Sequence, residues 1–207
     1  EKNISKTLVA TALSIASFGA MADATISVTS AQAPTSFAGL TGTFDPVGAN
    51  LSDIFSTFGT SFLKEATVSF SNMTPVKFTF LGKEAGNTNA FGLGVIDSVG
   101  NRVLLNTNTP GTTVSSSVLS GDFSFYFYDL NTGVTASNPS FAIGVAQGTD
   151  KSKALFVFND SGSKDGDYDD MVVSVTAVPE VETYAMMLAG LGLMGTIARR
   201  RNKAKVA

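Results

Sequence analysis

The stretch from Asn159 to Asp170 holds the densest set of groups that could do chemistry. It carries a single Lys and five carboxylates, those of Asp160, Asp165, Asp167, Asp169 and Asp170. Crowded like charges cost free energy unless water or a cation screens them, and Ca²⁺ takes about six to eight oxygens from Asp, Asn and backbone carbonyl groups. The stretch therefore predicts either a calcium site or a solvated turn whose Asp side chains cap backbone N–H groups.

The spacing of these carboxylates departs from that of an EF-hand loop. Counted from Asp165, the D-x-D-x-D part fits, but Asp170 stands where Gly is required and Thr176 where a bidentate Glu binds. A second polar stretch, from Phe80 to Phe91, offers further oxygen ligands in Glu84, Asn87 and Asn89. These side chains are of the right type to meet the Asp-rich turn in space, or to cap the turn between two strands.

Composition excludes several classes of function. The chain has no Cys and no His, which rules out disulfides, Ser-His-Asp and Cys-His nucleophiles and His-ligated zinc. Between Asp23 and Val178 it carries 14 acidic and 7 basic side chains, a net charge of −7, whereas nucleic-acid binding demands a basic face. The carboxylates of the Asp-rich stretch lie on one hydrophilic loop with nothing apolar nearby, so a glycosidase-like pair is not expected. We predict that the protein is not an enzyme.

The elements that must position these groups are strands. Period-2 alternation, rich in β-branched and aromatic residues, recurs between turn residues along the whole middle of the chain. It predicts strands at Ala24–Thr29, Ala66–Ser71, Val76–Leu81, Phe91–Ile96, Arg102–Asn106, Thr112–Leu119, Asp122–Tyr128, Ser140–Ala146, Lys153–Asn159 and Met171–Ala177. We expect an all-β fold, a two-sheet antiparallel sandwich of jelly-roll-like form with about ten strands.

The alternation also predicts which side chains fill the core. With 16 Phe and no Trp, Phe rings are expected to fill the space between the sheets. The predicted core consists of Ala66, Val68, Phe70, Val76, Phe78, Phe80, Phe123, Phe125, Phe127, Phe141, Ile143 and Val145. Helical spacing at Leu51–Leu63 predicts a short helix or a covering loop, interrupted by Gly59, and Asn131–Pro139 is the expected long surface loop.

The C-terminal segment has the features of a targeting signal. Val178-Pro179-Glu180 precedes an apolar run from Thr183 to Ala198, and Arg199, Arg200 and Arg201 follow directly. As a helix, the 16 residues of the run would extend about 24 Å against a hydrocarbon core of about 30 Å, which makes a marginal transmembrane helix. The basic cluster predicts a stop in the cytoplasm, with the preceding domain across the inner membrane.

This order of features resembles the PEP-CTERM sorting signal. Gram-negative bacteria that make exopolysaccharide use that signal with an exosortase-type membrane peptidase. The family's processing motif is normally Pro-Glu-Pro, and here it is Pro179-Glu180-Val181. The resemblance implies processing near Val178, Pro179 and Glu180 after transient anchoring in the inner membrane.

The N-terminal segment fits export. Lys2 and Lys6 precede an apolar stretch from Thr7 to Phe18, and Ala20-Met21-Ala22 supplies a small-x-small cleavage pattern. This predicts a Sec-type signal peptide, cut by signal peptidase after Ala22. The expected organisation is a signal peptide at 1–22, a β-sandwich domain at 23–177 and a sorting signal at 178–207.

Two inner stretches resemble parts of other exported proteins. The strand Leu155–Phe158, the Asp-rich turn and Asp167-Tyr168-Asp169-Asp170-Met171-Val172 resemble the ending of the DUF4114-like β domains that often precede a PEP-CTERM tail. Asp169 stands where those domains usually have Asn, which adds a charge. The stretch from Phe80 to Phe91 is similar to an element found upstream in such proteins.

These observations predict an exported, non-catalytic protein that is released or attached to the cell surface and the exopolysaccharide matrix. The alternative is a calcium-dependent carbohydrate-binding or adhesive sandwich. Its metal ligands would be drawn from the five Asp side chains of the turn and Glu84. Sugars usually stack on aromatic rings, and the chain has only four Tyr, of which Tyr126 and Tyr128 are expected on the outward side of one strand.

Overall fold

The protein contains an all-β domain with antiparallel sheets, as predicted. The computed structural model describes residues 24–37, 51–72, 74–84, 86–94, 102–118, 120–160, 168–178 and 188–197. Its contacts divide the chain into two compact units, one of which is Ala24–Val178. Every described strand pairing in that unit is antiparallel.

The strands form three hydrogen-bonded sheets, not two. The seven-stranded sheet has the order β2 (Thr35–Ser36), β3 (Ser61–Lys64), β12 (Ile143–Gln147), β13 (Lys153–Phe158), β14 (Met171–Ala177), β5 (Thr74–Gly82) and β8 (Thr113–Val118). The four-stranded sheet has the order β11 (Thr135–Ser137), β10 (Phe125–Asp129), β6 (Asn89–Leu93) and β7 (Arg102–Leu105). The three-stranded sheet has the order β1 (Ile26–Thr29), β4 (Thr67–Phe70) and β9 (Gly121–Phe123).

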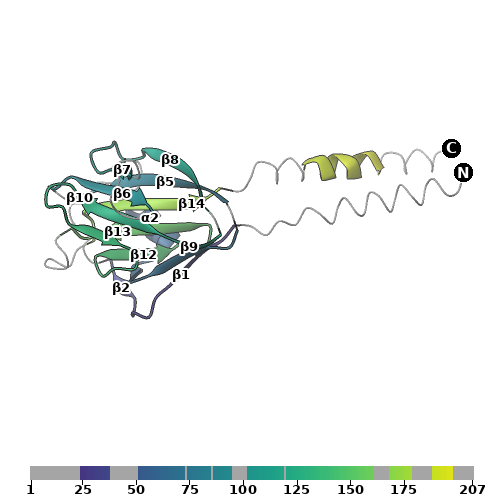
Figure 1. Ribbon diagram of the computed structural model, residues 1–207. Coiled ribbons are helices and arrows are strands. Elements are labelled where there is room, and N and C mark those ends of the chain that lie inside the picture. Colours follow the sequence, from purple (N-terminus) through teal and green to yellow (C-terminus); the bar gives the residue numbers. More distant parts are fainter. Residues whose placement is uncertain are drawn as a thin grey trace, which may run out of the picture. The chain divides into compact units, whose positions relative to one another are not determined.

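The expected single strand from Asp122 to Tyr128 is two strands, and this accounts for the extra sheet. β9 pairs with β4, whereas β10 pairs with β6 and β11. The chain changes partners at Ser124, whose carbonyl accepts a hydrogen bond from Gly94 N at 2.9 Å. The two smaller sheets nevertheless share one hydrophobic core with the seven-stranded sheet, so all three enclose the same interior (Figure 1).

Phe rings from different sheets meet in this core. Phe125 of β10 stacks on Phe156 of β13 with ring centroids 4.2 Å apart, and Phe127 stacks on Phe158 at 4.9 Å. Such stacked aromatic pairs add to the free energy gained by burying the rings. The prediction of a Phe-filled core is confirmed.

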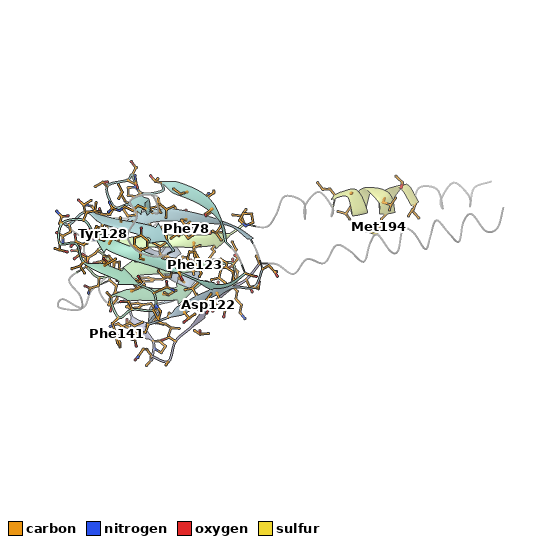
Figure 2. All side chains as sticks on the ribbon, viewed as in Figure 1. Phe78, Asp122, Phe123, Tyr128, Phe141 and Met194 are labelled. Carbon is orange, nitrogen blue, oxygen red and sulfur yellow. The ribbon has the colours of Figure 1, made fainter. Side chains whose placement is uncertain are left out.

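The prediction is wrong for one residue of the core, Phe141. Phe141 is 54% exposed, and Figure 2 labels it at the edge of the domain. The strand was predicted to begin at Ser140, but β12 begins only at Ile143. Before it, Ile143 N donates to Ser140 O at 3.3 Å, so the backbone at Phe141 turns.

The opposite face of the seven-stranded sheet is covered by the helix α2 (Leu51–Phe58). The helix confirms the spacing-based prediction for the first part of Leu51–Leu63. It ends at Gly59, which adopts φ +77° and donates to Phe55 O at 2.9 Å, as C-terminal Gly residues often do. Ser61–Lys64 is strand β3, and β11 lies inside the expected surface loop; the sequence analysis missed both strands.

Residues 188–197, drawn in yellow in Figure 1, are helical, and all of them are exposed. The remainder of the predicted transmembrane run lies outside the described residues. Within the described parts of the chain, no helix has both the length and the apolar character needed to cross a membrane.

Candidate functional site

The buried polar side chains of the domain gather at one end of its strands, which we call the polar end. Its buried members are Asn89, Asn106, Asp129, Asn159, Asp169 and Asp170. β6 begins at this end, and β7, β10 and β13 finish there, so antiparallel pairing brings their terminal residues together. In Figure 2, Tyr128, which precedes Asp129 at the end of β10, lies toward one side of the domain, and Asp122 of β9 lies farther toward the other side.

The Asp-rich turn and the stretch at Glu84–Asn89 do meet in space. Asn89 Nδ2 donates to Asp160 Oδ2 at 2.9 Å and lies 3.5 Å from the backbone oxygen of Asp170. Asp160 N in turn donates to Asp170 Oδ2 at 2.7 Å. One amide and two carboxylates, from the four-stranded and the seven-stranded sheets, therefore form a connected cluster.

Backbone contacts hold the neighbouring residues in place. Glu84 N donates to Asp169 O at 2.8 Å, while the Glu84 side chain is exposed. Tyr168 is buried, packs its ring 4.6 Å from that of Phe62 and donates its hydroxyl to Phe141 O at 2.5 Å. The chain is thus anchored immediately before Asp169 and Asp170.

Asp129 forms a second polar group at the same end, and the sequence analysis missed it. Its Oδ1 accepts from Asn131 N at 2.8 Å, and its Oδ2 accepts from Thr132 Oγ1 at 2.5 Å and from Asn87 Nδ2 at 3.1 Å. The pattern Asp129-Leu-Asn-Thr-Gly133 was the available signal, because an Asp that caps its own turn often precedes Asn and Gly. Its role is structural: it closes the turn that leaves β10.

Asn106 connects the two groups. Its backbone N–H donates to Asn89 O and its Nδ2 to Asn87 O, both at 2.8 Å. The side-chain oxygens of Asn89 and Asn106 are buried and have no hydrogen-bond partner among the described residues. Buried acceptors without a partner are rare in folded proteins, and such atoms often indicate a missing water or ion.

The remaining predicted site residues are distributed as follows. Asp165, Asp167, Ala22, Pro179, Glu180 and the cluster Arg199–Arg201 lie outside the described residues. Val178 is described, and its N–H donates to Pro75 O at 2.8 Å beyond the end of β14. Among the described side chains, no group of three or more Asp, Glu, His or Cys comes together to hold a metal ion.

The expected aromatic surface for sugars is smaller than the sequence indicated. Tyr126 does lie opposite the core-facing Phe residues of β10, but it is 2% exposed. Its ring occupies the space where a side chain at Gly92 would stand, on the neighbouring strand. Tyr128 is partly exposed, with the Arg102 guanidinium 4.9 Å from its ring centroid.

The two ends of the domain meet at a single turn on the opposite side from the polar end. Ile26 N, at the start of β1, donates to Lys151 O at 2.7 Å, and Ala177 N, at the end of β14, donates to Ser152 O at 2.8 Å. β13 runs from this turn to Phe158, next to Asn159, so its length separates the two ends of the domain from the polar end.

Comparisons with known proteins assign no family to this chain. No model of a known protein family matches it, and a search of curated proteins finds no similar sequence.

Proposed function

We propose that the protein is an exported, non-catalytic domain of the cell surface or the exopolysaccharide matrix, sorted by its C-terminal segment. The terminal motifs support this role: a signal peptide ending at Ala22, a processing motif at Val178–Glu180, and a transmembrane helix closed by Arg199–Arg201. An exosortase-type membrane peptidase and signal peptidase are the implied processing partners. The jelly-roll-like form of the sandwich belongs to the same proposal.

The observation that carries the proposal is the convergence of the two domain ends at Lys151 and Ser152. A leader and a tail that leave the domain at one turn can both be cleaved without cutting a strand. A tail anchored there would also leave the polar end, at the far end of β13, free to meet a partner. The absence of His and Cys supports a binding rather than a catalytic role.

Cell fractionation tests the proposal. An antibody against the domain should find the parent protein in the membrane and surface fractions, and deletion of Val178–Ala207 should release it from them. Mass spectrometry of the mature protein should give a C-terminus near Pro179. Recovery of the parent only from the cytoplasm, or an unchanged location after the deletion, would contradict the proposal.

The second candidate function is a calcium-dependent carbohydrate-binding or adhesive domain. The cluster of buried oxygens at the polar end favours it, because that end lies opposite the proposed anchor. Titration calorimetry with matrix polysaccharide, with and without Ca²⁺, separates the two functions. Heat that appears only with Ca²⁺ supports carbohydrate binding, and no heat in either case leaves the surface role alone.

A further inference from the structure

The side-chain amide of Asn89 can be placed in two orientations, and in each of them its oxygen lacks a hydrogen-bond donor among the described residues. In the observed orientation Nδ2 faces Asp160 Oδ2 at 2.9 Å and the Asp170 backbone oxygen at 3.5 Å. Oδ1 is then buried with no hydrogen-bond partner among the described residues. A buried acceptor in that state has lost its hydration without compensation.

The other orientation exchanges the positions of Oδ1 and Nδ2, two atoms of nearly the same size that are hard to tell apart. Oδ1 would then face the Asp160 carboxylate and the Asp170 backbone oxygen. Three oxygens would converge with no hydrogen between them, and one of them carries a negative charge. A cation bound among them would make that orientation favourable.

We propose that Asn89, Asp160 and Asp170 bind Ca²⁺ at the polar end of the domain. Asp170 brings both its backbone oxygen and a carboxylate, whose Oδ2 is held 2.7 Å from Asp160 N. Carboxylate, amide and carbonyl oxygens are the ligands that Ca²⁺ takes, in irregular geometries that Mg²⁺ does not accept. Zn²⁺ and Cu²⁺ prefer His or Cys ligands, and the chain has neither.

The bound ion would join the two layers of the domain. Asn89 begins β6 of the four-stranded sheet, whereas Asp160 and Asp170 flank the connection between β13 and β14 of the seven-stranded sheet. With two carboxylates and an amide, and water completing the shell, the site should be weak, with a Kd of about 10⁻⁴ to 10⁻³ M as in extracellular calcium modules. The proposal concerns the folded domain and does not depend on the surface role.

Thermal melting of the purified full chain, followed by circular dichroism, tests the site. At a roughly 10- to 100-fold excess of CaCl₂ over Kd, the midpoint should lie about 3 to 10 °C above that in EGTA. MgCl₂ at equal ionic strength should give a smaller shift. Tb³⁺, which replaces Ca²⁺, should show emission sensitised through tyrosine, because Tyr168 lies two residues from Asp170 and the chain has no Trp. Added Ca²⁺ should quench that emission.

Two variants separate a cation site from a hydrogen-bonded cluster. Asp160→Asn keeps an oxygen that accepts from Asn89 Nδ2 but removes the charge, so it should raise the Kd for Ca²⁺ by about tenfold or more. Asn89→Asp replaces the amide with a third carboxylate. It should lower the midpoint in EGTA and enlarge the Ca²⁺-induced shift. Asp122→Asn is the matched control, because Asp122 is exposed and distant from the polar end, and it should respond to Ca²⁺ like the parent.

Two results would overturn the proposal. In the first, about 10 mM Ca²⁺ leaves the midpoint and the Tb³⁺ emission of the parent unchanged, although this concentration exceeds the Kd of weak extracellular modules. In the second, Asp160→Asn and Asn89→Asp respond to Ca²⁺ like the parent, which would place any bound ion elsewhere in the chain. Neither result bears on where the cell delivers the protein.

Discussion

Gly144 shows how a single position can depend on a distant part of the chain. It lies in β12, between Lys64 of β3 and Val157 of β13 in the register. A Cβ at this position would stand 2.3 Å from Phe62 Cδ2 and 2.6 Å from Val157 Cγ2. Phe62 of β3 is buried and packs in one cluster with Ile54 and Phe58 of α2, so a shift of its ring would disturb these contacts.

We predict that Gly144→Ala destabilises the domain by about 1 to 3 kcal/mol, because the added methyl overpacks the contact with Phe62. Urea unfolding measures the change in the free energy of unfolding. Gly86→Ala is the control, since a Cβ there meets nothing within 4 Å, and it should change stability little. In a Phe62→Leu background the cost of Gly144→Ala should shrink, and a purely additive pair would contradict the packing argument.

At the residue scale the sequence predicted which side chains face the core better than it predicted single close contacts. The alternation of Phe123, Phe125 and Phe127 survives the break at Ser124, and all three are buried. Gly144 has no such signal, because its partner Phe62 comes from a strand that was not expected. The proximity of Asn89 and the Asp-rich turn was one of two alternatives that the sequence left open, whereas the buried Asp129 was not expected.

At the scale of elements, α2 covers the outer face of the seven-stranded sheet, a face that is exposed to solvent in many antiparallel sheets. Ile54 and Phe58 of the helix join Leu155, Val157 and Val172 of the sheet in a second hydrophobic cluster. β13 is consequently buried on both faces, with a nearly continuous apolar sequence, Ala-Leu-Phe-Val-Phe. The helix could be predicted from its spacing, but β2 and β11 are too short to produce a clear alternation.

We predict that Ile54→Ala destabilises the domain by about 2 to 5 kcal/mol, because it removes buried methyl groups and leaves a cavity beneath the helix. Thr57→Ala on the same helix is the control. Thr57 is only partly buried, and its backbone oxygen, which accepts from Thr149 N at 3.0 Å, is retained. Urea unfolding followed by circular dichroism would compare them. Equal, small effects of the two substitutions would show that α2 contributes little to stability.

At the scale of the whole molecule, the hydrophobic clusters found among the described residues lie within the β domain. Their members run from Ala24 to Ala177, and Gln147 Nε2 donates to Ile26 O, which ties β1 to the end of β12. The order of signal peptide, domain and sorting signal stays a prediction from the terminal motifs. The sequence did not predict the sheet count, because a change of strand partner at one Ser leaves the alternation intact.

We therefore predict that a chain of residues 24–178 unfolds in urea with the same midpoint and the same steepness as the full chain. All the buried contacts described above remain in it, including the hydrogen bond from Val178 N to Pro75 O. A chain that ends at Val173 is the matched comparison. It loses the pairing of Ser174–Ala177 with β5 and β13 and the buried side chains of Val175 and Ala177, so its midpoint should fall clearly. A lower midpoint for 24–178 itself would mean that the terminal segments pack on the domain. Processing would then cost stability, and cleavage at Pro179 would not be structurally neutral.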